Sequence, residues 1–420
     1  MSTYKYSLSR YFPEGTEYFY GYPADEDSHF FNGVPPEIEE MVSGRPMVCA
    51  GPNVNVICFT ACLDSVPFKI LKDDLDVIRV DRKQIITLPK KITGKVRGSK
   101  RNKLIKNALF ELAEPHKLVM AQPYLDPRAK EFFQIPPHRS IWLNDKRNMS
   151  SYIPKAYLPE IYEEFMDGAC FQQVIQLPLP CVIKVTSSSS GDGVRICHTQ
   201  EDLDKAVADF GHLEGMIQAS EYVKIYRNFA VQFGVPHDSS KDIEIINWHE
   251  QLIAPNGSFL GGIIEDCLHD PLFEPLNKVL LEKILPEVRR RGWYGVGGFD
   301  ILMTEDERFY FVDPNFRMTG MTVYDFLARN NVIKKSLLSF TGVFHGSERE
   351  FREKILPVAR PGAGQQMYIT VLTHGPKVFR LNAALLFNDR KELPGIAAAL
   401  IARGVESTVL TDVAGVGNLM

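Results

Sequence analysis

Short apolar runs alternate with amphipathic stretches along most of the chain. In its middle part, runs with the length of β-strands lie at residues 181–185, 194–198, 229–235, 243–254, 299–303 and 309–312. Two further stretches repeat apolar residues every three or four positions: one follows Thr199, a residue suited to capping a helix, and the other covers residues 273–291. This alternation predicts a mixed α/β protein.

The alternation divides the chain into three zones. Residues 1–141 mix short apolar runs at 46–50, 54–62 and 117–121 with helical stretches, which predicts a small N-terminal α/β domain. Residues 142–346 form the middle zone, with one subdomain at about 150–215 and a second at about 216–346. Residues 347–420, with a strand near 367–372 and a helix near 393–403, are predicted to form a small C-terminal domain.

Composition excludes several classes of protein. The 420 residues are 45% hydrophobic and 24% charged, which is typical of globular proteins, and a net charge of -4 gives no general attraction to nucleic acid or to an anionic membrane. The seven cysteines include no CxxC pair, so neither a disulfide framework nor a structural zinc site is expected. With no apolar stretch of about 20 residues and a polar start, we expect a cytoplasmic protein.

A small polar loop between two predicted strands is a candidate phosphate site. It consists of Thr186, four serines (Ser187, Ser188, Ser189, Ser190) and Gly191-Asp192-Gly193, and Lys184 precedes it on the first strand. Small hydroxyl residues and glycines let backbone N–H groups approach phosphate oxygens closely. A flexible surface turn is the alternative. Neither a GxxxxGK[ST] string nor a GxGxxG helix opening accompanies the loop.

The strongest chemical signal is a predicted β-hairpin that carries two acids. If the strands at 299–303 and 309–312 pair symmetrically about Asp306 and Glu307, Asp300 lies opposite Asp313, and Asn315 shares their face. Opposed acids are destabilising unless a cation compensates them, and carboxylate and amide oxygens are suitable ligands for Mg²⁺. The alternative is a hairpin whose acids are simply solvated.

The other face of this hairpin is apolar. Because side chains alternate along a strand, we expect Phe299, Ile301 and Val312 to point away from the acids and into a core. Arg317 follows two residues after Asn315 and is a candidate clamp for a phosphate or carboxylate, with a surface salt bridge as its alternative.

In combination and in order, these segments resemble the ATP-grasp superfamily over about residues 143–340. Lys146 and Lys184 resemble the family's two ATP-contacting lysines, and residues 187–193 resemble the mobile loop over the β and γ phosphates. Gln218, Glu221, Tyr222 and Val223 lie in a segment that resembles the adenine-binding hinge, with Glu221 accepting from the adenine amino group. Asp300, Asp313 and Asn315 resemble the magnesium triad.

The sequence also departs from this family pattern at three positions. Asn228 stands where the family has a ribose-binding acid, and Asp313 stands where a glutamate is more usual. Gly298 stands where some D-alanine:D-alanine ligases carry an arginine, so the resemblance assigns the role of that arginine to Arg317.

The resemblance implies an ATP-grasp fold, with a domain before the grasp and a small domain after it. It further implies ATP and two Mg²⁺ ions, for which Mn²⁺ can substitute, an acyl phosphate intermediate, and small-molecule carboxylate and amine substrates joined in an amide bond. A thiol acceptor on a carrier protein and a non-catalytic ATP-binding regulator are the alternatives. Oligomeric state is open, with a homodimer as one option.

Two further features have competing interpretations. Residues 90–106 contain eight lysines and arginines and no acid, which favours either docking of an acidic carrier protein or a solvated loop. His249 and Glu250, on the predicted strand 243–254, either reach the substrates or are satisfied within the sheet.

Overall fold

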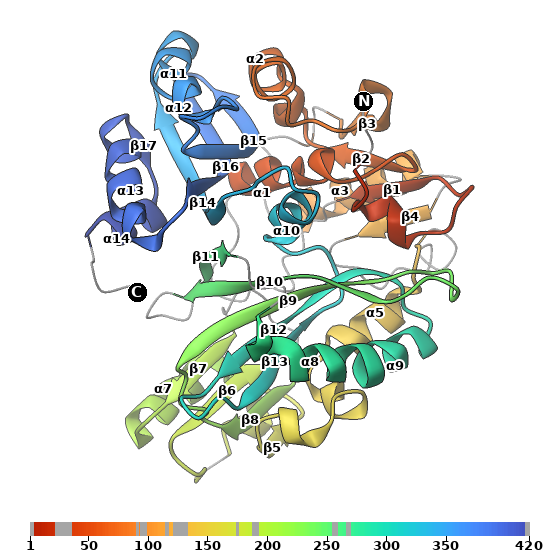
Figure 1. The fold of residues 1–420 in the computed structure, drawn as a ribbon. Helices are drawn as coiled ribbons and strands as arrows, with labels where there is room; N and C mark the ends of the chain where they lie inside the picture. The colour runs from red at the N-terminus through yellow and green to blue at the C-terminus, as the bar shows by residue number, and fades with distance from the viewer. Residues whose placement is uncertain are drawn as a thin grey trace.

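The computed structural model describes residues 4–21, 36–89, 92, 99–113, 117–120, 133–173, 176–186, 193–253, 259–265 and 270–415. These residues form three β-sheets with helices packed against them (Figure 1), which confirms the predicted mixed α/β class.

The N-terminal sheet is parallel and has four strands in the order β3-β2-β1-β4. Its strands are β1 (Tyr18–Gly21), β2 (Val54–Cys58), β3 (Ile85–Thr87) and β4 (Lys117–Met120). The accompanying helices are α1 (Pro36–Val42), α2 (Ser65–Lys69) and α3 (Ser99–Ala113). The apolar run at 46–50 is not a strand: a 3₁₀ helix covers Arg45–Val48, with Pro46 in its first turn.

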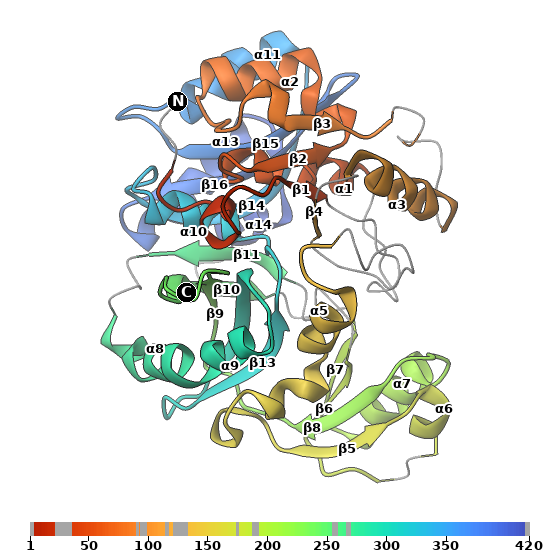
Figure 2. The ribbon, with the colours of Figure 1, turned by 90° about the vertical axis from the view of Figure 1, so that its right-hand side faces the viewer.

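The small sheet is antiparallel, with the order β5-β8-β6-β7. It consists of β5 (Ile161–Phe165), β6 (Cys181–Val185), β7 (Val194–Cys197) and β8 (Ile217–Glu221), with helices α6 (Gly168–Phe171) and α7 (Gln200–Phe210). As predicted, Thr199 caps α7, and its side chain accepts from the backbone N–H of Asp202. Helix α5 (Pro137–Asn144) precedes this sheet, which lies below α5 in Figure 2.

The large sheet has nine strands, eight of them in the order β13-β12-β9-β10-β11-β14-β16-β15, while β17 pairs with β14. Its strands are β9 (Arg227–Val235), β10 (Glu244–Ile253), β11 (Phe259–Ile264), β12 (Gly295–Met303), β13 (Phe309–Asn315), β14 (Ser336–His345), β15 (Met367–Gly375), β16 (Val378–Phe387) and β17 (Val405–Glu406). Because β14 pairs with β16, the sheet continues across residue 346, where the chain pattern suggested a domain boundary.

Helices cover the large sheet. One face of strands β9, β10, β12 and β13 packs on α8 (Glu274–Val279) and α9 (Leu285–Arg290), which a π-helical turn, Leu280–Ile284, joins into the amphipathic stretch that the sequence predicts. The remaining helices are α10 (Thr322–Arg329), α11 (Glu348–Lys354), α12 (Leu356–Ala359), α13 (Leu393–Ala402) and α14 (Thr408–Gly415).

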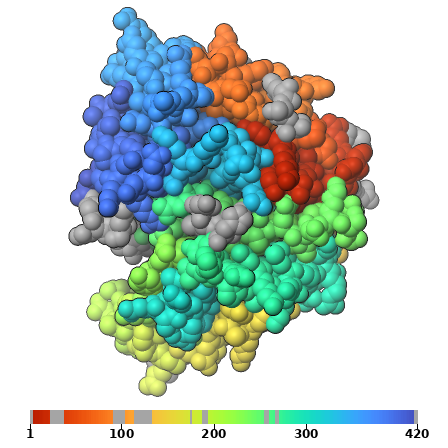
Figure 3. All heavy atoms as spheres, viewed as in Figure 1, coloured from red at the N-terminus to blue at the C-terminus, as the bar shows by residue number. Residues whose placement is uncertain are grey.

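The N-terminal and C-terminal segments share one hydrophobic core. Buried residues from β1 and β2 belong to the same cluster as residues from α10, β14, β15, β16 and α13. In the space-filling view, the red and orange N-terminal part and the blue C-terminal part accordingly form the upper body, while the yellow and yellow-green residues of the small sheet lie below (Figure 3).

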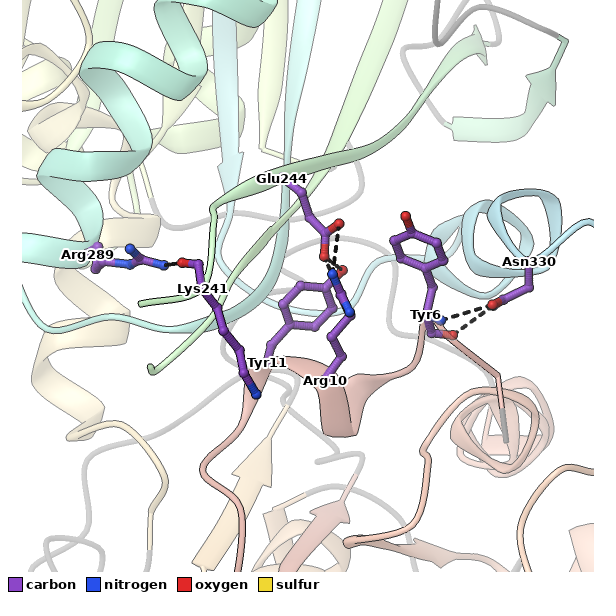
Figure 4. A network of polar contacts seen from close by, with 7 residues as sticks. All are labelled: Tyr6, Arg10, Tyr11, Lys241, Glu244, Arg289 and Asn330. Atoms are coloured by element: carbon purple, nitrogen blue, oxygen red, sulfur yellow. Dashed lines mark hydrogen bonds and ion pairs between the residues drawn. The ribbon is translucent and has the colours of Figure 1, made fainter. Parts of the chain in front are cut away.

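A polar network fastens the N-terminus to the large sheet and to α10 (Figure 4). The Arg10 Nε lies 2.6 Å from Glu244 Oε1 at the start of β10, and the Tyr11 hydroxyl donates to the same oxygen over 3.0 Å. The Asn330 side chain, just after α10, bonds both the N–H and the C=O of Tyr6. Gly234 leaves room for this contact, because a Cβ there would lie 1.9 Å from the Tyr11 ring.

Candidate active site

Polar side chains of four neighbouring strands share one face of the large sheet. The pairings of β13, β12, β9 and β10 place them in two cross-strand rows, Asp313–Asp300–Ala230–His249 and Asn315–Gly298–Gln232–Asn247. The opposite face contributes Val231, Phe299 and Trp248 to the buried core. With Ala230 and Gly298 near the centre of the rows, no bulky side chain stands between the polar groups.

The hairpin places the two acids as the sequence predicts. Asp300 is the cross-strand partner of Asp313, and Asn315 lies opposite Gly298. A register shift at Val312 separates this part of the hairpin from the part near the turn, where Ile301 pairs with Phe311. The core beside Phe299 and Ile301 therefore receives Phe311, and the prediction that Val312 points there is wrong.

Both predicted ATP lysines lie close to these acids. The Lys146 Nζ lies 2.9 Å from Asp313 Oδ1, and the Lys146 side chain is only 4% exposed. Lys146 reaches β13 because Asn144, two residues earlier, accepts through Oδ1 from the backbone N–H of Phe316 over 2.8 Å. Lys184 is buried on β6 of the small sheet. The two sheets thus converge on one cluster of opposite charges.

The two carboxylates repel each other. Burial and the charge of the neighbouring Asp313 raise the pKa of Asp300 to about 7. Asp300 Oδ1 accepts one hydrogen bond, from Gln251 Nε2 over 3.0 Å. Because like charges directly opposite in a sheet are unfavourable, a bound cation would stabilise this pair.

The donor set suits a hard divalent cation. Among the described residues, no three histidine, cysteine, aspartate or glutamate side chains converge on one point. Two carboxylates and the amide of Asn315 instead supply oxygen ligands, the kind that Mg²⁺ uses together with substrate phosphates. The residues present therefore fit Mg²⁺ bound with a nucleotide better than a metal held by protein alone.

Gly298 is required by its neighbours on β9. A Cβ at this position would lie 2.4 Å from Gln232 Nε2 and 2.9 Å from the carbonyl oxygen of Val231. Gln232 in turn accepts from the hydroxyl of Thr322, at the start of α10, over 2.9 Å. The position where some related ligases carry an arginine is thus filled by the Gln232 side chain in this protein.

We expect Gly298→Ala to destabilise the protein by about 1–3 kcal/mol through overpacking against a backbone carbonyl. Gly395→Ala is the matched control, because a Cβ at Gly395 in α13 meets nothing within 4 Å and alanine favours the helix. Urea unfolding of the two variants should give changes of opposite sign, and equal stabilities would contradict this account.

The pKa of Lys184 is lowered by its surroundings. Burial, together with the nearby charge of Lys146, lowers the pKa of Lys184 to about 8, whereas Asp313 acts in the opposite direction. A bound triphosphate would favour the protonated amine. Above pH 8, nucleotide binding must therefore be accompanied by proton uptake.

The affinity for ATP is therefore expected to fall about tenfold per pH unit above pH 8. Lys184→Arg should remove this dependence, because guanidinium stays charged throughout the range. Calorimetric titration with ATP at pH 7, 8 and 9 measures it, and a wild-type affinity that stays constant up to pH 9 would argue against this role of Lys184.

A cavity of about 580 Å³ opens between the end of β8 and the turn of the hairpin. Its lining includes Glu221, Tyr222 and Val223, which the sequence assigns to the adenine hinge, together with Thr304 and Tyr310. The Glu221 carboxylate accepts from the backbone N–H of Glu160 over 3.2 Å. In this structure the Glu221 side chain therefore has a partner within the protein.

Some of the remaining predicted site residues lie in the described part of the chain and others do not. Gln218 is buried next to Lys184 in the small sheet and donates to Glu164 Oε1. Asn228 lies on β9, where it pairs with Leu302 of β12. Gly193 directly precedes β7. The loop residues Ser187, Ser188, Ser189, Ser190 and Gly191 lie outside the described residues.

Arg317 follows β13 and lines a small cavity that also includes Tyr20 and Val119, near the carboxyl ends of strands β1 and β4. Among the described residues, no carboxylate forms an ion pair with Arg317.

The site also contains Gln232, Asn247 and Gln251, which the sequence did not predict. Their signal was available, because each is a polar residue within an apolar strand run.

Comparison with known proteins confirms the resemblance seen in the sequence. A family model described as L-aspartate–L-methionine ligase, ATP grasp, matches residues 163–315, the segment that contains most of the small sheet and the acid hairpin. The fold is also similar to that of biotin carboxylase from Campylobacter jejuni in a β-γ-ATP complex, with a TM-score of 0.55, 14% identity, and coverage of 93% of this chain and 92% of that chain. Both findings support the resemblance to the ATP-grasp superfamily.

Two further solved structures are similar to this chain over nearly the whole length of both proteins. An N5-carboxyaminoimidazole ribonucleotide synthetase in complex with ADP has a TM-score of 0.56 at 11% identity and covers 96% of this chain and 98% of that chain. The N5-carboxyaminoimidazole synthetase from Staphylococcus aureus with ADP has a TM-score of 0.54 at 12% identity, with coverage of 92% and 96%. At such identities, these structures establish the fold alone.

The match to a ligase family indicates an enzyme of the ATP-grasp ligase type. No helix among the described residues combines the length and the apolar character that crossing a membrane requires.

Proposed function

We propose that this ATP-grasp enzyme activates the carboxylate of one amino acid as an acyl phosphate and joins it to the amine of a second, releasing ADP and phosphate. The observation that carries the proposal is the cluster on the large sheet, where Asp300 faces Asp313 while Lys146 contacts Asp313. The match to a family described as L-aspartate–L-methionine ligase supports amino acids as both substrates.

Asp300, Asp313 and Asn315 would hold Mg²⁺, either as one ion or as two, with Mn²⁺ as a substitute. When bound with ATP, the metal supplies positive charge to the γ phosphate and so makes it a better electrophile. Burial and the repulsion between the two aspartates, which together raise the pKa of Asp300, support a cation at this position.

The protein's own residues complete the proposed chemistry. Lys146 and Lys184 would neutralise phosphate oxygens, and the hinge at Glu221, Tyr222 and Val223 would hold adenine in the adjoining cavity. Arg317 would bind the carboxylate of the first substrate and then stabilise the oxyanion that forms when the amine attacks. Loop residues 187–193, closing over the phosphates, would exclude water from the acyl phosphate.

The proposal is tested by measuring ADP release with all pairs of proteinogenic L-amino acids, beginning with L-aspartate and L-methionine, and with bicarbonate as a further carboxylate. Mass spectrometry then identifies the product. We expect a dipeptide from at least one pair, formed only with ATP and Mg²⁺ or Mn²⁺. Product formation with bicarbonate alone would instead assign a carboxylation reaction.

Two alternatives give different results in the same experiment. A carboxylate–thiol ligase would release ADP with pantetheine or an acidic carrier protein as acceptor, and not with amines. Of the basic run at residues 90–106, a candidate docking site for such a carrier, residues 99–106 belong to α3, whereas residues 90–91 and 93–98 lie outside the described residues. A non-catalytic ATP-binding regulator would bind ATP without release of ADP under any of these conditions.

A further inference from the structure

Beside the acid cluster, the large sheet carries an aspartate–histidine pair that the chemistry described so far does not use. Asp325 lies on α10, the helix that packs over β10, and none of its surface is exposed to solvent. Neither of its carboxylate oxygens has a hydrogen-bond partner among the described residues. His249 Nδ1 lies 3.4 Å from Asp325 Oδ1.

A buried carboxylate without partners is unfavourable by several kcal/mol, so its retention calls for a compensating group. His249 is that group by position, because its side chain is 2% exposed and its Nδ1 faces the carboxylate. The His249 Nδ1 atom is buried and has no hydrogen-bond partner among the described residues, so this nitrogen is not satisfied within the sheet. Asp–His contacts in unliganded enzymes are often long and tighten when substrate binds.

The pair also has a defined position relative to the reaction. His249 lies in the same cross-strand row as Asp300 and Asp313, separated from Asp300 by one strand and by the small residue Ala230. Cross-strand partners project from the same face of a sheet. The imidazole is therefore on the nucleotide face, with Asp325 behind it on α10.

From this geometry we propose that His249 is a catalytic base for the incoming amine and that Asp325 is its positioning residue. This rests on the proposed ligase function. An Nδ1–H donated to Asp325 leaves Nε2 as the proton acceptor. The substrate ammonium first gives one proton to His249 Nε2, which passes it to solvent. The resulting amine nitrogen then bonds the acyl carbon while the acyl–oxygen bond to phosphate breaks, and the second proton of nitrogen leaves with the phosphate as hydrogen phosphate.

The test separates activation of the carboxylate from transfer to the amine. With L-aspartate and ATP, hydroxylamine traps the acyl phosphate as a hydroxamate, and hydroxylamine is uncharged at neutral pH and needs no prior deprotonation. His249→Asn keeps an amide donor near the Nδ1 position but removes Nε2. We expect this variant to form hydroxamate at close to the wild-type rate and to make dipeptide with L-methionine about 100-fold more slowly.

Asp325→Asn should show the same split to a smaller degree, since it leaves His249 in place but removes the negative charge that stabilises the protonated imidazole. The matched control is His374→Asn on β15, where the histidine ring packs against Phe379, and both rates should stay at the wild-type level. Thermal unfolding and ADP binding show whether each variant is folded.

The outcomes distinguish this inference from the function on which it rests. If wild-type protein forms no hydroxamate from any proteinogenic L-amino acid, the proposed function is wrong, and the inference falls with it. If the wild type forms hydroxamate but His249→Asn loses hydroxamate and dipeptide formation equally, or neither, His249 is not the base for the amine. A loss confined to the dipeptide reaction supports the proposal.

Discussion

Asp300→Asn is expected to lower ATP turnover about 1,000-fold while the protein remains folded. The loss of one carboxylate from the proposed metal site removes about 4 kcal/mol of charge stabilisation in the transition state. The same change removes the repulsion between opposed acids, so the melting temperature in metal-free buffer should stay the same or rise. ADP release at saturating Mg²⁺ and a thermal melt provide the two measurements.

The matched control for this variant is Glu353→Gln on α11, which likewise replaces a carboxylate with an amide. Glu353 is exposed, pairs with Arg349 at 2.8 Å, and lines neither of the two cavities described above. We expect turnover within about twofold of the wild type, because an exposed ion pair contributes little. Undiminished Mg²⁺-dependent turnover of Asp300→Asn would refute the metal assignment.

Arg317→Ala is expected to reduce dipeptide formation by about 100- to 1,000-fold, the range typical of losing one oxyanion donor. Arg317 follows the acid hairpin directly and forms no ion pair with a carboxylate among the described residues, so its charge is available to a substrate. The Michaelis constant for the carboxylate substrate should rise as well. Arg317→Lys should retain only part of the wild-type rate, because an ammonium group cannot form the bidentate hydrogen bonds of a guanidinium group.

Arg349→Ala tests whether the Arg317 effect is specific. Arg349 is 85% exposed on α11, pairs with Glu353 and lines neither cavity, so its loss removes a charge of the same type away from the proposed site. Both kinetic constants should stay near their wild-type values in this control. An Arg317→Ala protein with the same constants would exclude Arg317 from substrate binding and from the oxyanion.

The acid hairpin shows how far local sequence reasoning extends. A short polar turn between two apolar strands fixes the register of a hairpin, which is why Asp300 opposite Asp313 could be predicted without a structure. The bulge at Val312 could not, because strict alternation assumes a regular strand and a bulge inserts one residue. As a result, Phe311 takes the core position that was assigned to Val312.

The groups around the hairpin depended on contacts between distant parts of the chain. Residue type and order suggested Lys146 and Lys184, but only the packing of α5 on β13 and of the small sheet beside it brings them to the acids. The isolation of Asp325 was likewise invisible, because α10 meets β10 through tertiary packing.

The sequence by itself determined the α/β class, strands β6, β7, β9, β10, β12, β13 and β15, and the pairing of Asp300 with Asp313, but not strands β5, β8, β11, β14, β16 and β17. These follow from side-chain periodicity and turn length, which act over a few residues. Only the tertiary structure showed that β14, before residue 346, pairs with β16, after it, in one sheet, and that His249 faces Asp325. Such contacts join residues far apart in the chain, and their free energy comes from burial and charge compensation that local pattern does not encode.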